Sequence, residues 1–118
     1  MILAVLDDLM FTSKIKTTAS GLGAAVTFAR SADAALAEMR KSLPSLVIFD
    51  LNNARINPLT IVASMKQDPA LASVPTIGYV SHVDTATINA ARDAGVGEIL
   101  ARSAFTTQLA EILSRSNA

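Results

Sequence analysis

Short apolar runs alternate with helical patterns along the chain, and this alternation constrains the fold more than any other feature. A continuous apolar run without polar alternation is typical of a strand that is buried on both faces of its sheet. Two strands with a helix between them are joined by a crossover connection, so they run parallel. The predicted strands are residues 2–6, 25–29, 46–49, 74–80 and 96–101.

Residues that favour helix ends separate these strands. Ser, Asp and Asn side chains cap helix N-termini, proline is tolerated in the first turn, and glycine commonly ends a helix. The candidates are Ser31 and Asp84 as N-caps, Asn57-Pro58 as a helix start, and Gly21-Leu22-Gly23 and Gly95 as stops. The last helix is predicted to begin at about Thr106.

These elements predict a doubly wound α/β fold with a five-stranded parallel sheet and helices on both faces. The flavodoxin-like (βα)5 arrangement has the strand order 2-1-3-4-5. A chain of 118 residues is long enough for one hydrophobic core and too short for two ordinary domains. We therefore expect a single domain over residues 1–118.

Composition excludes several classes of function. Ten acidic and ten basic residues give a formal charge of zero, so we expect no nucleic-acid partner. The absence of cysteine excludes disulfides and thiolate metal sites and fits a cytoplasmic protein. A membrane span needs roughly 20 apolar residues, and the run at residues 2–6 is far shorter. We expect a soluble, cytoplasmic protein with no membrane partner.

Three aspartates follow two of the predicted strands. Asp7 and Asp8 come after the first strand and Asp50 after the third, and these strands are neighbours in the expected order. Doubly wound folds bind ligands at the carboxyl ends of their strands. Carboxylates that converge there repel one another unless a cation such as Mg²⁺ lies between them. The plain alternative is that these acids are solvated loop residues.

The order and spacing of these motifs resemble the receiver domain of two-component response regulators. The similarity extends from residue 1 to about 115. It rests on Leu6-Asp7-Asp8, Val47-Ile48-Phe49-Asp50-Leu51, Asp68-Pro69, Val74-Pro75 and Ala94-Gly95.

The resemblance implies a role for each residue that matches a family motif. Asp50 matches the phosphoacceptor, and Asp7 and Asp8 match the acids that hold Mg²⁺ together with Asp50. Asn52 matches the residue whose backbone carbonyl completes the metal site. The implied reaction is self-phosphorylation, in which a carboxylate attacks phosphorus and forms an acyl phosphate. The donor would be a histidine kinase or a phosphotransfer protein, and no other enzymatic activity is expected.

Three positions depart from the family pattern. Val80 takes the place of a Ser or Thr hydroxyl, and Ser81 is the alternative, although a shift of one residue points a side chain to the other face. Arg102 takes the place of a lysine, and Ile99 takes the place of an aromatic switch residue. Loss of a hydrogen bond to a charged oxygen costs about 1.5–3 kcal/mol, so we expect weakened phospho-switching.

The loop after Arg102 departs as well. Ser103-Ala104 replaces the family's cis-proline, and a cis bond without proline costs about 2.5–4 kcal/mol, so we expect a reshaped trans loop. Among the remaining polar residues near the aspartates, Asn53 and Arg55 are interpreted as ordinary loop residues and His82 as a surface residue.

The leading hypothesis is a signalling module that acts through protein–protein contacts, including a homodimer through the face formed by the fourth and fifth helices and the fifth strand. A phosphorylation-independent binding module is the first alternative. A Mg²⁺-dependent phosphatase of the haloacid dehalogenase type would need a second acid where Asn52 stands. A flavodoxin would need a Ser/Thr/Gly-rich loop where Asp7-Asp8-Leu9-Met10 stands.

Overall fold

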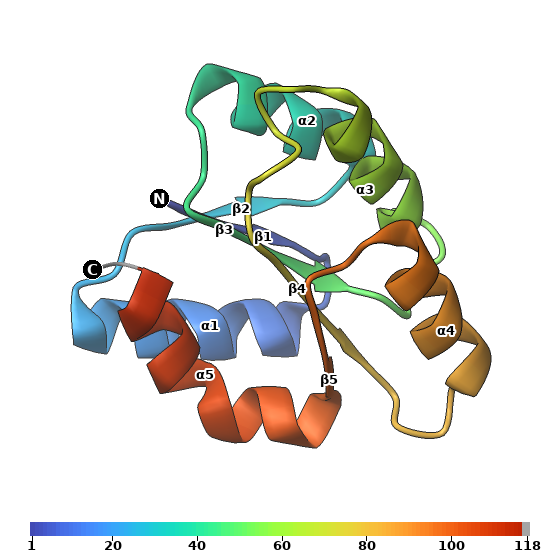
Figure 1. The fold of residues 1–118 in the computed structure, drawn as a ribbon. Helices are drawn as coiled ribbons and strands as arrows, with labels where there is room; N and C mark the ends of the chain where they lie inside the picture. Colours follow the sequence, from blue (N-terminus) through green and yellow to red (C-terminus); the bar gives the residue numbers. More distant parts are fainter. Residues whose placement is uncertain (117–118) are drawn as a thin grey trace.

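The computed structural model describes residues 1–116 and has a central sheet between two layers of helices (Figure 1). The elements in chain order are β1 (Ile2–Val5), α1 (Leu9–Leu22), β2 (Val26–Ala29), α2 (Ala32–Lys41), β3 (Leu46–Asp50), α3 (Pro58–Gln67), β4 (Thr76–Val80), α4 (Thr85–Ala94), β5 (Glu98–Ala101) and α5 (Arg102–Ser116). All strand pairs are parallel, and the order β2-β1-β3-β4-β5 confirms the predicted topology. The predicted domain ends at residue 118, and residues 117 and 118 lie outside the described part.

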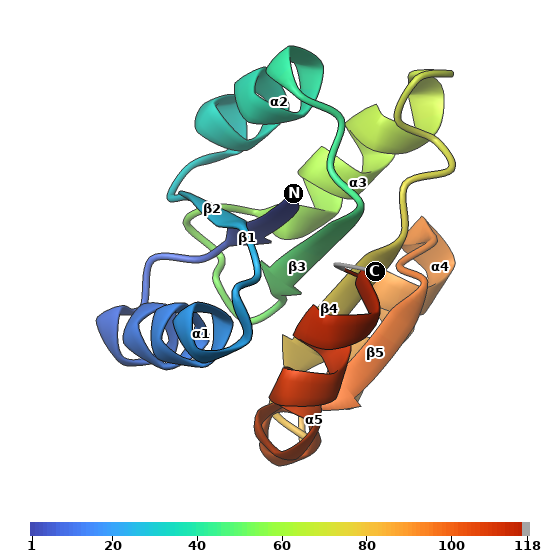
Figure 2. The ribbon, with the colours of Figure 1, turned by 90° about the vertical axis from the view of Figure 1, so that its left-hand side faces the viewer.

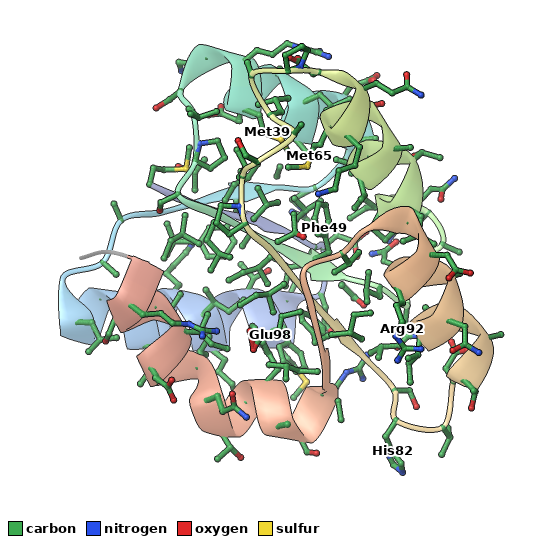
Figure 3. The ribbon with its side chains drawn as sticks, viewed as in Figure 1. Met39, Phe49, Met65, His82, Arg92 and Glu98 are labelled. Atoms are coloured by element: carbon green, nitrogen blue, oxygen red, sulfur yellow. The ribbon has the colours of Figure 1, made fainter. Side chains whose placement is uncertain are left out.

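The helices divide between the two faces of the sheet. α1 and α5 pack together on one face, and α2, α3 and α4 form a row on the other (Figures 1 and 2). Each face has its own apolar cluster: Ile48 and Phe105 belong to the cluster under α1 and α5, and Phe49 and Met65 to the cluster under the other three helices (Figure 3). Because side chains alternate along a strand, Asp50 follows Ile48 onto the α1/α5 face.

The predicted helix ends are confirmed at four positions. Ser31 and Asp84 each accept the backbone N–H three residues later, as N-cap side chains do. Gly23 and Gly95 end α1 and α4 in the left-handed conformation, with φ of 68° and 98°. Asn57 precedes α3 with φ of 55° and makes no side-chain cap bond.

The start of the last helix was predicted incorrectly. α5 begins at Arg102, directly after β5, and not at about Thr106. With Ser103-Ala104 in place of proline, the backbone can enter the helix at once, and the Thr106 hydroxyl donates to the Arg102 carbonyl oxygen at 3.0 Å. The described residues contain no cis peptide bond, as expected for this junction.

The bounds of all five strands differ from the predicted bounds by two residues or fewer at each end. Within residues 1–116, none of the helices is both long enough and apolar enough to span a bilayer.

Candidate functional site

Asp50 is the last residue of β3 and lies opposite Tyr79 of β4 in the sheet register. It is only 8% exposed, and its Oδ1 accepts the backbone N–H of Asn52 at 3.1 Å. Burial raises the pKa of the Asp50 carboxyl above its ordinary value, and the Asn52 hydrogen bond and the nearby Arg102 charge offset part of this rise. Asp50 is therefore a poorly solvated carboxylate at the carboxyl end of the sheet.

Asp7 and Asp8 lie at the same edge, as predicted, because β1 and β3 are neighbours. Their negative charges contribute to the raised pKa of Asp50. Asp8 is exposed and is the N-cap of α1, where its Oδ1 accepts the backbone N–H groups of Met10 and Phe11 at 2.8 and 3.1 Å. The start of α1 thus depends on Asp8.

Asp7 is held by two residues that the sequence interpretation treated as ordinary loop residues. Its Oδ1 accepts from Asn53 Nδ2 at 2.7 Å, and its Oδ2 forms an ion pair with Arg55 Nη2 at 2.6 Å. The loop between β3 and α3 therefore closes over the end of β1. In the sequence, the only signal for these contacts with Asp7 was that Asn53 and Arg55 are polar and follow Asp50 closely.

The carboxylates of Asp7, Asp8 and Asp50 at this edge of the sheet, called the acidic pocket below, are oxygen ligands of the kind that a hard cation such as Mg²⁺ prefers. Their present arrangement does not form a ready metal site: across residues 1–116, no three His, Asp or Glu side chains are grouped as metal ligands. Asp7 and Asp8 instead use their oxygens for hydrogen bonds within the chain. Any metal bound here must compete with those partners.

Asn52 connects the β3–α3 loop to the β4–α4 loop. Its Oδ1 accepts the backbone N–H of Ser81 at 2.7 Å, and its Nδ2 donates to Asp84 Oδ2 at 2.9 Å. Hydrogen bonds from Thr87 and, to a smaller extent, from Asn52 hold the pKa of Asp84 below its ordinary value. The Asn52 side chain thus fixes the segment that follows β4.

Val80 and Ser81 point to different sides at the end of β4. Val80 is fully buried in the cluster under α2, α3 and α4, where Ile99 also packs. Ser81 is half-buried and borders a hollow of about 420 Å³ beside the start of α5. That hollow is lined by Phe11, Ser81, His82, Arg102, Ser103 and Thr106. Ser81, and not Val80, therefore borders the hollow beside Arg102, and His82 is exposed, as predicted (Figure 3).

Three aromatic rings stack together on the α1/α5 side of the sheet, which is also the side of Asp50. Tyr79 stacks on Phe11 and on Phe105, with ring centroids 4.8 Å apart in both pairs. The Arg102 guanidinium lies 5.5 Å from the centroid of the Phe11 ring, and the described residues show no ion pair between Arg102 and Asp50. The cation at this position is thus held by an aromatic face.

Tyr79 is a further residue that sequence reasoning missed. It is 0% exposed, and within the described chain its hydroxyl has no hydrogen-bond partner. Burial, followed by the Asp50 charge, raises the pKa of the phenol far above its ordinary value. The sequence signal was a single tyrosine on a strand of otherwise small or aliphatic residues.

Comparisons with known proteins identify the fold. No family model matches the sequence, and no curated protein matches it at a significant level. The phosphorylated cyanobacterial phytochrome response regulator RcpA superposes with a TM-score of 0.80 at 24% identity, covering 97% of this chain and 88% of that one. The Mn²⁺-bound response regulator Rcp1 gives a TM-score of 0.80 at 19% identity, covering 96% and 91%. A response regulator from Hahella chejuensis gives 0.86 at 16% identity, covering 98% and 92%.

These superpositions extend over nearly the whole chain. The protein therefore has the fold of response-regulator receiver domains, and the predicted resemblance is confirmed at the level of the fold. At these identities the likeness carries no information on individual site residues, so the roles of Asp50, Asp7, Asp8 and Asn52 stay predictions.

Proposed function

We propose that this chain is a single receiver-like domain for signal transduction, which accepts a phosphoryl group on Asp50 and acts through protein–protein contacts. The observation that carries the proposal is the position of Asp50, buried at the carboxyl end of β3 beside Asp7 and Asp8. Two proteins of the same fold, one phosphorylated and one Mn²⁺-bound, make this chemistry a reasonable expectation for the fold.

The proposed reaction begins with the Asp50 carboxylate. One of its oxygens forms a bond to phosphorus while the bond between phosphorus and the donor breaks, and the electron pair of that bond stays with the donor. Asp7, Asp8, Asp50 and the backbone carbonyl of Asn52 are the residues that would hold Mg²⁺, which when bound neutralises the phosphoryl oxygens. Arg102 replaces the family's lysine as the nearby cation, and its guanidinium lies 5.5 Å from the centroid of the Phe11 ring.

The proposed switch is weak because its relay residues are replaced. Val80 has no hydroxyl and lies in the core, and Ile99 is not aromatic. A lost hydrogen bond to a charged oxygen costs about 1.5–3 kcal/mol, which reduces the population shift on phosphorylation about tenfold or more. We infer that phosphorylation changes the conformation of the β4 end less than a threonine at this position would allow.

The proposed partners follow from the receiver fold. A histidine kinase or phosphotransfer protein would donate the phosphoryl group, and a homodimer would form through the α4, β5 and α5 face. The balanced charge of the chain is consistent with a cytoplasmic protein that binds neither nucleic acid nor membranes. No enzymatic activity is proposed beyond self-phosphorylation and dephosphorylation at Asp50.

A phosphorylation-independent binding module is the second candidate. The observation that favours it is the state of Asp7, whose two oxygens are already bonded to Asn53 and Arg55. A pocket that satisfies its own carboxylates can remain folded without metal or phosphate and serve only as part of a binding surface.

Intact mass after incubation with Mg²⁺ and acetyl phosphate tests the proposal. The parent protein is expected to gain one phosphoryl group, and Asp50→Ala is expected to gain none. Asp93→Ala is the matched control, because Asp93 is an exposed aspartate on α4 and should leave the adduct unchanged. If the parent gains no adduct, the phosphoacceptor proposal is wrong and the binding-module candidate replaces it.

A further inference from the structure

We propose that Arg55 is a built-in counter-ion of the acidic pocket, which occupies Asp7 until a divalent cation displaces it. This inference rests on the proposed function to the extent that Mg²⁺ binds among Asp7, Asp8 and Asp50. It adds a regulatory residue from the β3–α3 loop that controls how tightly the pocket binds metal.

The contacts of Asp7 are the first step. Asn53 donates to its Oδ1 at 2.7 Å and Arg55 donates to its Oδ2 at 2.6 Å, so each carboxylate oxygen already has a partner. Bonds between a charged donor and a carboxylate are short and strong among protein hydrogen bonds. The Asp7 side chain is only 15% exposed, which strengthens its interaction with the guanidinium relative to a fully solvated pair.

The two partners of Asp7 differ in how firmly they are held. Asn53 is fixed by its own loop, since its Oδ1 accepts the backbone N–H of Ile56 at 3.0 Å and Ile56 is buried in the core. The Arg55 side chain is 83% exposed. Its guanidinium can therefore swing into solvent without unfolding the loop, while the Asn53 amide stays in place.

The guanidinium and a metal ion would compete for the negative charge of Asp7. Both are cations, and placing a divalent ion beside a guanidinium on one carboxylate is electrostatically unfavourable. The only ion pair that the structure describes in this pocket is the one between Arg55 and Asp7. Metal binding at Asp7 should therefore weaken that pair, and removal of the Arg55 charge should make binding tighter.

Calorimetric titration of the purified full chain with Mg²⁺, and separately with Mn²⁺, tests the inference. Arg55→Gln removes the charge and keeps a polar side chain, and it is expected to bind each ion roughly fivefold more tightly than the parent, as an exposed ion pair allows. Arg40→Gln is the matched control, because Arg40 is an exposed arginine in the last turn of α2 and makes no ion pair in the described chain. Its affinity should equal that of the parent.

Ionic strength gives a second readout. Because an exposed ion pair is screened by salt, the difference between Arg55→Gln and the parent should shrink when the titration is repeated in about 1 M KCl. Circular dichroism of the metal-free variants confirms that each is folded. An Arg55→Gln variant that binds no metal, or binds it no more tightly than the parent, would overturn the inference.

The outcome is separable from that of the proposed function. If Arg55→Gln binds metal more tightly but neither protein gains a phosphoryl adduct, Arg55 is the counter-ion and the phosphoacceptor proposal fails. If both proteins form the adduct and their metal affinities are equal, Asp50 is the phosphoacceptor and the inference on Arg55 fails.

Discussion

The unpaired hydroxyl of Tyr79 predicts that Tyr79→Phe stabilises the protein. The phenol is fully buried and has no hydrogen-bond partner within residues 1–116, so the described residues do not replace the hydration that its hydroxyl loses on folding. Leaving a buried polar group unsatisfied costs about 1–3 kcal/mol. Phenylalanine removes that cost and keeps the ring that stacks on Phe11 and Phe105 at 4.8 Å.

The void left by the missing oxygen is the opposing effect. It is about the size of one water probe, roughly 15 Å³, and at about 24 cal/mol per Å³ it costs about 0.4 kcal/mol. The net gain in the free energy of unfolding is therefore about 0.5–2.5 kcal/mol. For a domain of this size, that gain raises Tm by about 4 °C per kcal/mol, or roughly 2–10 °C.

Alkaline pH provides a second arm of the same experiment. The folded-state pKa of Tyr79 is raised, so above pH of about 10 the unfolded chain loses the phenol proton while the folded chain keeps it. The unfolded state then binds fewer protons, and the stability of the parent falls as pH rises, by about 1.4 kcal/mol per pH unit from this group alone. Tyr79→Phe lacks this loss, so its advantage over the parent should widen above pH of about 10.

Urea and thermal unfolding, followed by circular dichroism, measure both effects. Phe105→Leu is a useful control, because it disrupts the stack without changing a polar group and should destabilise the protein. If Tyr79→Phe lowers the free energy of unfolding by about 1 kcal/mol at neutral pH, the hydroxyl has a partner, such as a buried water, and the reasoning is refuted.

Two further predictions concern the neighbouring polar residues. Asp50→Asn should raise the free energy of unfolding by about 0.5–2 kcal/mol at neutral pH, because burial raises the pKa of Asp50 and the folded state disfavours its charge. This gain should vanish at acid pH, where the carboxyl of the parent is protonated. Urea unfolding at both pH values measures the difference, and an Asp50→Asn variant that is less stable than the parent at neutral pH would contradict the prediction. Asn52→Ala should lower the free energy of unfolding by about 0.5–1 kcal/mol and speed amide exchange at Ser81, because it removes the bonds to Ser81 and Asp84. Unchanged exchange measured by NMR would mean that the β4–α4 loop is held by other contacts.

The fold could be predicted from the sequence because its three central strands are buried on both faces. Apolar runs such as residues 46–49 have few alternatives to a central strand, and the helices between them leave only parallel connections. Convergence of Asp7 and Asp50 followed from the same topology, since the carboxyl ends of neighbouring parallel strands share an edge. The start of α5 was missed because α5 follows β5 directly, so no turn signal in the sequence separates the two elements.

The contacts within the pocket could not be predicted in the same way. Arg55 lies 48 positions from Asp7 in the sequence, and periodicity carries no information on which loop side chain reaches which carboxylate. The sequence also could not reveal that the buried hydroxyl of Tyr79 has no hydrogen-bond partner within residues 1–116. Such pairings depend on loop conformation, which the local sequence determines weakly.

The position of Tyr79 also gives the chain a natural optical probe. It is the only tyrosine, and the chain has no tryptophan, so ultraviolet emission from this protein reports almost entirely on one ring. That ring lies opposite Asp50 in the sheet register and stacks on Phe11, the residue that supports the Arg102 guanidinium. Ligand or metal titrations at the sheet edge can therefore be followed by intrinsic fluorescence, without a label and without changing any residue.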